Sequence, residues 1–422
     1  MNPLPTRLDK LELENFRCFS KLEVDFNDKL TLIVAPNGGG KTALLEAACF
    51  GWKFFVQGIE LNKTSKGFAE GDIRLALMNG GGMQPVKPVW LRAGSHVGNS
   101  PFGWTIHKGG KTPIRTSTTD AGDIKSEGNR LRLATQDHAE GKLTDSPVLP
   151  VLGYYGTGRL WAAQKITAKR RKQIKPDTSR TGGYNQCLSP NSHFGLFEVW
   201  FGRYSLEALQ ERSNNKPSSH RPSEKLQAVG SAVDALLKPT GWHSLSFDVS
   251  NEAIFAEHPI YGRIPVSMLS DGIRVMIGLV GDIAHRCARL NPHFGADAAR
   301  LTPGVILIDE VDMHLHPEWQ QLVLTVLRDA FPLVQFIVTT HSPQVVTTVK
   351  RENIRILVRH PDGSWSATPP AEETKYDKIM AFLAQNDGLS ETATARKSGV
   401  SRSSVRLIKL GIHSLSPKSK FK

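Results

Sequence analysis

The feature that most constrains this chain is a glycine-rich segment placed between an apolar run and a helix. Leu30 to Val34 is followed by residues 35–42, Ala-Pro-Asn-Gly-Gly-Gly-Lys-Thr. A buried strand that turns through glycines into a helix beginning near Lys41 is the context of a phosphate-binding loop. There, backbone N–H groups and the helix N-terminus surround phosphate oxygens. The predicted nucleotide contacts are Asn37, Gly38, Gly39 and Gly40, with Lys41 at the β- and γ-phosphates and Thr42 on Mg²⁺.

One position departs from the usual phosphate-loop pattern. The pattern G-x-x-x-x-G-K-[ST] begins with glycine, and this chain has Ala35 there. Alanine is tolerated at a position whose φ is negative. Binding of a nucleotide with Mg²⁺ therefore remains the expectation.

Composition limits the class of protein. The chain has 422 residues and 39% hydrophobic residues, enough for one large domain with insertions or for two to three domains. Its longest apolar runs are too short for a transmembrane helix, and its polar start does not resemble a signal peptide. The four cysteines are far apart in sequence, which favours reduced thiols over disulfides or a zinc site. We therefore expect a cytoplasmic protein without a membrane partner.

Basic residues dominate the charge and are clustered. The net charge is +13 and the pI is near 9.6. Seven basic residues and one acid lie between 165 and 180, and eight basic residues and one acid follow position 388. These clusters predict an attraction to nucleic acid. The alternative is an ordinary soluble protein with a basic surface.

The pattern of apolar residues predicts an α/β fold. Residues 8–34 alternate as two or three strands of an antiparallel unit, and a helix follows from 41 to about 55. Residues 60–145 are interpreted as a β-rich insertion with a flexible loop at 108–145, and residues 162–190 as a mobile segment. Helices separated by a polar gap at 213–223 are expected in 194–238, and helices again at 271–290 and 318–330. Strands are expected at 148–155, within 244–266, and at 305–308, 335–339 and 354–358.

Strands that alternate with helices imply a sheet with parallel strands. We divide the chain into an N-terminal lobe (1–160), a basic and mostly helical lid (161–243), a C-terminal lobe (244–365) and a basic helical tail (366–422).

Two acids follow the apolar run 305–308. This run places Asp309 and Glu310 at the carboxyl end of a buried strand, about 270 residues after the phosphate loop. Asp309 is expected to bind Mg²⁺ through water, and Glu310 to polarise the attacking water, because the γ-phosphate needs its charge neutralised in the transition state. The alternative is a strand that ends in two solvated acids.

Two further segments are candidates for the same site. His341 follows an apolar strand and could contact the γ-phosphate or orient water near Glu310, although a histidine at a strand end is often structural. Leu269-Ser270-Asp271-Gly272 opens a helix, and Ser270 at its N-cap with the following N–H groups would form another anion site. An ordinary capped helix also explains this tetrapeptide.

Taken together, these motifs resemble those of the ABC-type ATPases. The phosphate loop, Leu-Ser-x-Gly, Asp-Glu with a later Leu-His-Pro, and Thr-His-Ser occur in that family's order. The segments Leu13 to Phe19 and 148–161 are similar to the RecF/SMC-like group, which includes small stand-alone ATP-binding proteins of bacterial DNA repair and anti-phage defence. The resemblance implies an ABC-type head with a mixed β-sheet, a helical lid and a small C-terminal helical tail.

The resemblance also implies a composite site. Two heads would close on ATP, with Ser270 and Gly272 of one copy at the γ-phosphate held by Lys41 of the other. His341 matches the switch histidine, and Asp312 lies next to the D-loop. Arg17 matches an arginine near the nucleotide.

Two other features depart from the family pattern. Asp271 replaces a signature glycine, as is often seen in this group. No clear glutamine loop is found, and Gln57 and the segment 71–74 are both candidates for it.

The C-terminal tail carries a second motif. Ala-x-x-x-Gly-Val-Ser-x-x-x-Val resembles a helix-turn-helix of the resolvase type, whose third helix would present Arg402, Ser403 and Arg406 to DNA. The alternative is a basic helical tail that packs on its own domain or on a partner.

The predicted function is an ATPase that dimerises on ATP and controls a nucleic-acid or effector partner, in DNA repair or phage defence. Related proteins with a nuclease in the same chain carry an acidic domain after the ATPase. Here the residues that follow are few and basic, so an effector nuclease would be encoded separately. The alternatives are a nucleotide-switched DNA-binding regulator and, with less support, the ATPase subunit of a transporter.

Overall fold

A six-stranded sheet forms the centre of the computed structural model. The structure describes residues 5–60, 68–77, 81–109, 116–117, 121–159, 179–190, 194–214 and 221–370. The strand order of the central sheet is β16-β15-β3-β14-β13-β9, and only β16 is antiparallel to its neighbour. Four of these strands are buried along their whole length, as expected for parallel strands covered on both faces. The bounds are β3 Leu30–Val34, β9 Val151–Tyr155, β13 Gly304–Ile308, β14 Val334–Thr340, β15 Ile354–Arg359 and β16 Trp365–Thr368.

A second, antiparallel sheet lies beside the first, with the order β2-β1-β6-β7-β8. Its strands are β1 Thr6–Phe16, β2 Phe19–Asp25, β6 Val89–Val97, β7 Ser100–Lys108 and β8 Thr116–Ser117. The two sheets are joined by the side chain of Gln335 on β14, which accepts from the Leu8 N–H and donates to the Leu8 carbonyl, both at 2.8 Å.

This arrangement corrects two expectations about the N-terminal half. The strand at 30–34 does not belong to the antiparallel unit, because β3 pairs in parallel with β14 and β15. The strands of 60–145 do not all form a separate insertion either, because β6 pairs with β1 and completes the N-terminal sheet.

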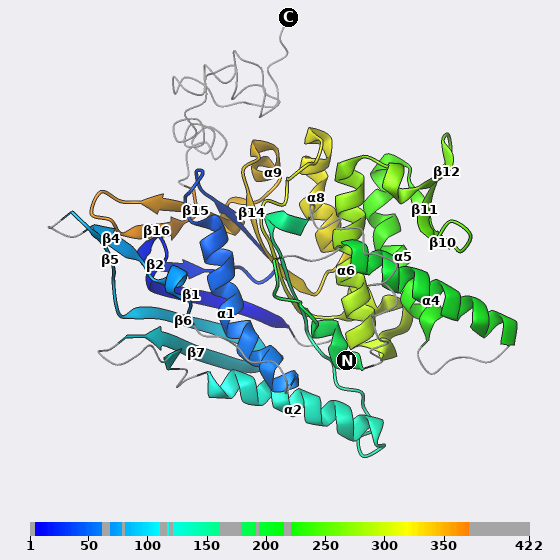
Figure 1. Ribbon diagram of the computed structural model, residues 1–422, viewed down its shortest axis with the longest axis horizontal. Helices are drawn as coiled ribbons and strands as arrows, with labels where there is room; N and C mark the ends of the chain where they lie inside the picture. The colour runs from blue at the N-terminus through cyan, green and yellow to red at the C-terminus, as the bar shows by residue number, and fades with distance from the viewer. Residues whose placement is uncertain are drawn as a thin grey trace, which may run out of the picture.

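Two helices cross beside the N-terminal sheet, and one of them was not expected. Helix α1 (Lys41–Ile59) follows the phosphate loop, and α2 (Gly122–Ala139) lies where the sequence predicted a flexible loop. Figure 1 shows α2 crossing the far end of α1. At the crossing, a Cβ on Gly58 would lie 2.0 Å from the carbonyl oxygen of Lys125, so the backbones approach as closely as glycine allows.

A helical layer covers the other side of the central sheet. It contains α4 (Phe194–Asn214), α5 (Pro222–Leu237), α6 (Asp271–Leu290) and α8 (Pro317–Ala330), which gather on one side of the molecule (Figure 1). The strands β10 (His243–Asp248), β11 (Ala253–His258) and β12 (Gly262–Pro265) form a small sheet at its edge. The predicted helices at 194–238, 271–290 and 318–330 are confirmed. Among the described residues, no helix is long and apolar enough to cross a membrane.

The segment expected to be mobile at 162–190 is ordered in its described part. The short 3₁₀ helix η3 (Arg180–Tyr184) is held by the Arg180 guanidinium, which donates to the carbonyl oxygens of Leu290 at 2.8 Å and Pro147 at 2.6 Å. Burial lowers the pKa of Arg180 to about 10. Arg180 is therefore a structural cation rather than part of a basic surface.

Candidate nucleotide-binding site

The phosphate loop has the predicted form, with its glycines where the backbone requires them. Gly38 and Gly40 have φ values of 72° and 81°, a region that disfavours residues with a Cβ. A Cβ on Gly38 would meet nothing within 4 Å, whereas one on Gly40 would lie 2.5 Å from the Phe19 ring and 2.8 Å from Cys18 Sγ. Gly40 is thus also fixed by packing against the turn between β1 and β2.

The substitution at Ala35 is accommodated. Ala35 is fully buried and does not have a positive φ, so alanine is unstrained there. The ammonium group of Lys41 donates to the carbonyl oxygens of Ala35 at 2.9 Å and Pro36 at 3.1 Å. Lys41 therefore lies over the loop, where a phosphate chain would be held.

Oxygen ligands suited to Mg²⁺ meet at the carboxyl ends of the central strands. Thr42 Oγ1 donates to Asp309 Oδ2 at 2.6 Å, and Thr339 Oγ1 on β14 donates to Asp309 Oδ1 at 2.6 Å. Within the described residues, no group of three or more His, Cys, Asp or Glu side chains could hold a metal alone. A hydroxyl and one carboxylate fit Mg²⁺, which keeps water and substrate phosphates as its other ligands.

Glu310 and His341 lie beside this pair. His341 Nε2 is 3.8 Å from Glu310 Oε1. The Glu310 N–H donates to Thr339 Oγ1 at 2.8 Å, and Glu310 has a φ of 47°. The Asp312 carboxylate accepts a hydrogen bond from the Thr340 hydroxyl and one of 3.3 Å from the His341 N–H. These backbone hydrogen bonds thus hold Glu310 and His341 next to the Thr42–Asp309 pair.

Arg17 reaches the helix that follows the phosphate loop. Its guanidinium forms an ion pair with Glu46 on α1, and it lies 2.9 Å from Asp72 Oδ1. Burial opposes the charge of Arg17, but hydrogen bonding and attraction from these carboxylates outweigh it and raise the pKa.

The contact with Asp72 also separates the two glutamine-loop candidates. It brings the segment 71–74 to the start of α1. Gln57 lies sixteen residues along the same helix, about 24 Å from its first turn. Of the two candidates, only 71–74 is near the site.

The signature segment lies apart from the phosphate loop. Helix α6 begins at Asp271 with Ser270 as its N-cap, and the Asp271 side chain is 66% exposed and paired with Arg274. A Cβ on Gly272 would lie 2.8 Å from the His314 carbonyl oxygen. Within the described residues, no hydrogen bond or ion pair links 269–272 to 35–42.

Sequence reasoning missed Thr339 and Tyr155. Tyr155 is the last residue and Thr339 the second-to-last residue of the two strands that flank β13. Both bond to Asp309, Thr339 through its hydroxyl and Tyr155 through its carbonyl. The available signal was their position at strand ends beside the predicted Asp309. Arg402, Ser403 and Arg406 lie outside the described residues.

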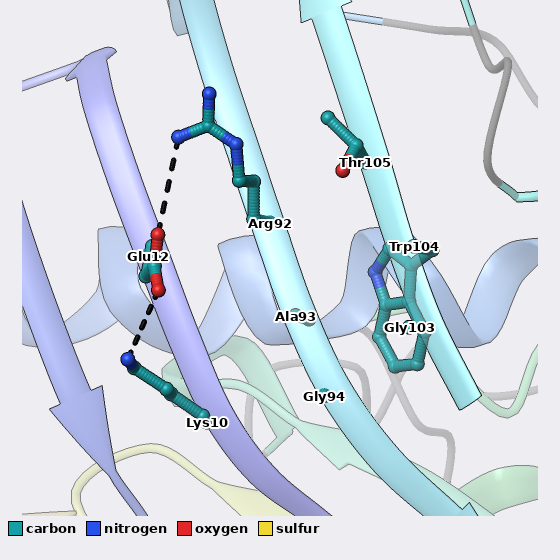
Figure 2. A pocket seen from close by; sticks show the side chains of 8 residues that line it. All are labelled: Lys10, Glu12, Arg92, Ala93, Gly94, Gly103, Trp104 and Thr105. Carbon is teal, nitrogen blue, oxygen red and sulfur yellow. Dashed lines mark ion pairs between the residues drawn. The ribbon is translucent and has the colours of Figure 1, made fainter. Parts of the chain in front are cut away.

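A hollow of about 380 Å³ lies elsewhere, on the outer face of the antiparallel sheet. Figure 2 shows Glu12 between Lys10 and Arg92, with N···O distances of 3.0 and 3.9 Å. The paired residues Gly94 and Gly103 form its floor. It includes none of the predicted nucleotide contacts.

Comparison with known proteins agrees with this geometry. A family model described as an AAA domain matches residues 10–216, and a second, described as an AAA domain, putative AbiEii toxin, Type IV TA system, matches 172–347. The first includes the phosphate loop, and the second includes the signature, Asp309 and His341. A crystal structure of an Smc head bound to the C-winged helix domain of ScpA covers 87% of this chain and 98% of its own, with a TM-score of 0.50 and 15% identity, which shows the fold.

These matches support the assignment of the chain to the RecF/SMC-like group of ABC-type ATPases. The probable ATPase of retron Vc95 from Vibrio cholerae is 26% identical to it, over 85% of this chain and 74% of the relative. The Septu protein PtuA of Bacillus mycoides is 43% identical, over 89% of this chain and 44% of the relative. The sequence prediction of the family and of the ABC-type head is thus confirmed.

Proposed function

We propose that this protein binds ATP with Mg²⁺ and hydrolyses it. The observation that carries the proposal is the Thr42–Asp309 pair at 2.6 Å, with Glu310 and His341 beside it and Lys41 over the loop. Each of these side chains has a chemical role in phosphoryl transfer to water.

The roles follow from position and charge. Lys41 and the N–H groups of 38–42 bind the β- and γ-phosphates, and Thr42 and Asp309 orient the cation. Bound Mg²⁺ would neutralise charge on the phosphate oxygens in the transition state. Glu310 accepts a hydrogen bond from the attacking water and polarises it, and His341 orients Glu310 and faces the γ-phosphate.

We further propose that the site is completed by a second copy of this chain. Among the described residues, no hydrogen bond joins the signature residues Ser270 and Gly272 to the phosphate loop of their own chain, and the neighbouring Met268 is 76% exposed. ATP would then hold two heads together, and hydrolysis would release them.

Two substitutions test this function. Lys41→Ala should abolish ATP binding, and Glu310→Gln should keep binding but reduce turnover at least about 100-fold, because removal of a catalytic base typically costs 10²–10⁴. Glu310→Gln should also accumulate the dimer in ATP, measured by light scattering. The matched control is Glu318→Gln, whose side chain is 86% exposed on α8. Wild-type turnover of ATP in Lys41→Ala and in Glu310→Gln would refute the proposal.

The relatives support a role in phage defence with a separately encoded effector. The retron ATPase and the Septu protein are defence-associated, and each aligns with most of this chain. We propose that the ATPase cycle controls such an effector, and nucleic acid is the proposed trigger because the chain carries a net charge of +13. Plaque counts on cells with the intact locus or with Glu310→Gln test this role. Equal phage sensitivity would contradict it.

A further inference from the structure

The buried residue Tyr155 connects the two separate halves of the site. It ends β9, and its carbonyl oxygen accepts from the Asp309 N–H at 2.8 Å. Its hydroxyl donates to Asp282 Oδ2 at 2.8 Å, and Asp282 lies on α6. One residue therefore bonds through its carbonyl to Asp309, the proposed Mg²⁺ ligand, and through its hydroxyl to α6, the helix that begins at the signature.

The link is buried, and two donors meet on one oxygen, Asp282 Oδ2. Tyr155 is 1% exposed, and the side chains of Asp282 and Arg286 are 14% and 10% exposed. Arg286 Nε donates to Asp282 Oδ2 at 2.8 Å, and Arg286 Nη1 donates to the Gly183 carbonyl at 2.7 Å. Burial and the charge of Asp282 raise the pKa of Tyr155, so its hydroxyl stays a neutral donor. Such a network has one favoured arrangement, since any unmade bond leaves a buried polar group without a partner.

Helix α6 can carry a displacement from this network to the signature. Asp282 is twelve residues from Ser270, which corresponds to about 18 Å along the helix axis. The interior of α6 is regular from Asp271 to Leu290, without proline. A movement of the Asp309 backbone on binding of a cation would therefore reach α6 through Tyr155, and would displace Ser270 together with α6.

We propose that the Tyr155–Asp282–Arg286 network couples the magnesium side of one ATP site to the signature that the same chain supplies to its partner. Tyr155 is thus a positioning residue, and it makes the two sites of the dimer cooperative. The inference rests on the proposed ATPase function and dimer. By linkage, occupancy of one site then changes the affinity of the other, and a dimer with two sites has a Hill coefficient of at most about 2.

The test compares two removals of a buried tyrosine hydroxyl in the full-length protein. Tyr155→Phe keeps the ring and removes the bond to α6. The control is Tyr184→Phe, because Tyr184 is also 1% exposed and its hydroxyl donates to the Pro150 carbonyl at 2.7 Å rather than to α6. The measurements are the Hill coefficient of ATP hydrolysis and the melting temperature.

We expect positive cooperativity in wild type and in Tyr184→Phe, and a Hill coefficient near 1 in Tyr155→Phe with turnover retained. A second pair of variants tests the network if Tyr155→Phe does not fold. Asp282→Asn keeps an oxygen acceptor for Tyr155 and should retain cooperativity, whereas Asp282→Ala should lose cooperativity.

Unchanged cooperativity in Tyr155→Phe, an equal loss in Tyr184→Phe, or non-cooperative wild-type hydrolysis would overturn the coupling and leave the ATPase function intact. Absence of ATP hydrolysis by the wild type would instead overturn the proposed function, and this inference with it.

Discussion

Gly40 is constrained at the residue scale by both its backbone and its neighbours. Its φ of 81° disfavours any side chain, and a Cβ would lie 2.5 Å from the Phe19 ring, which is fully buried. We expect Gly40→Ala to lower the free energy of unfolding by about 2–5 kcal/mol, since a left-handed residue costs about 1–2 kcal/mol and overpacking adds about 1–3 kcal/mol. Urea denaturation measures this loss.

Gly38→Ala separates the two causes. Gly38 has a φ of 72° but nothing within 4 Å of its Cβ position, so only the backbone term applies. Its loss of stability should be smaller than that of Gly40→Ala. Equal losses would show that the contact with Phe19 has no energetic weight.

Thr339 holds Asp309, the proposed Mg²⁺ ligand, and the backbone of Glu310 with one hydroxyl. Thr339→Val keeps the shape and leaves a buried carboxylate oxygen without its donor, which costs about 1–3 kcal/mol. We expect a several-fold higher Mg²⁺ concentration for half-maximal ATP hydrolysis. The control is Thr347→Val on α9 (Pro343–Thr347), where the hydroxyl bonds only within its own helix. The same shift in both variants would contradict this role.

The residue-scale motifs could be predicted because their chemistry limits the residue type. A lysine after glycines and an acid pair after an apolar strand have few alternative explanations when they occur together. Thr339 could not be singled out, because threonine is common in strands and its role depends on which strand lies beside β13.

At the scale of elements, the crossing of α1 and α2 depends on two glycines. A Cβ on Gly58 would lie 2.0 Å from the Lys125 carbonyl oxygen, and one on Gly128 would lie 2.2 Å from the Phe55 carbonyl oxygen. Neither contact can be relieved by a side-chain rotation, so Gly128→Ala should separate the helices and destabilise the fold by about 1–3 kcal/mol or more. Thermal unfolding measures the effect.

The opposite sign is expected for a helical glycine with free space. A Cβ on Gly230 in α5 would meet nothing within 4 Å. Gly230→Ala should stabilise the protein by about 0.5–1 kcal/mol, because alanine loses less conformational entropy in a helix. If Gly230→Ala instead destabilises the protein, the space beside Gly230 is not free and the expectation is wrong.

Helices with a clear apolar stripe were predicted well, and α2 was not. Helix α8 has nearly the bounds expected from its sequence, since its buried residues Val323, Leu324, Val326, Leu327 and Ala330 recur with helical spacing. In α2 the buried residues are only Ile124, Glu127, Gly128 and Leu131. Two of these four are a charged residue and a glycine, so the apolar residues alone show no helical spacing. The helix is instead specified by its packing against α1.

The hairpin of β15 and β16 supports the phosphate loop from outside. Trp365 Nε1 donates to the Cys18 carbonyl at 3.2 Å, and the indole packs edge-on against Phe19 with ring centroids 5.2 Å apart. Because Phe19 contacts Gly40, Trp365→Ala should loosen the loop and weaken ATP affinity several-fold, with a smaller effect in Trp365→Phe. Titration with a fluorescent ATP analogue tests this, and equal affinity in Trp365→Ala would refute the support.

At the scale of the whole molecule, the order of the strands is what the sequence could not predict. The central sheet takes β3 and β9 from the first 160 residues and β13 to β16 from beyond residue 300. Alternation of strands and helices indicates parallel pairing, but the neighbour of each strand is decided by long-range packing. The same limit explains why Tyr155, next to Asp309 only through β9–β13 pairing, was not predicted.

The net charge of +13 leads to a prediction for the whole protein. We expect DNA to raise the ATPase rate, and its affinity to fall steeply with salt, since each neutralised phosphate contributes about −0.9 to the slope of log K against log salt. Joint replacement of Arg402 and Arg406 by alanine should weaken binding and flatten this slope, if the tail contacts phosphates. Replacement of Lys418 and Lys420 removes the same charge and is the matched control. If both pairs weaken DNA binding equally, the attraction comes from net charge alone. If DNA does not change the ATPase rate, ATP hydrolysis is not coupled to nucleic acid.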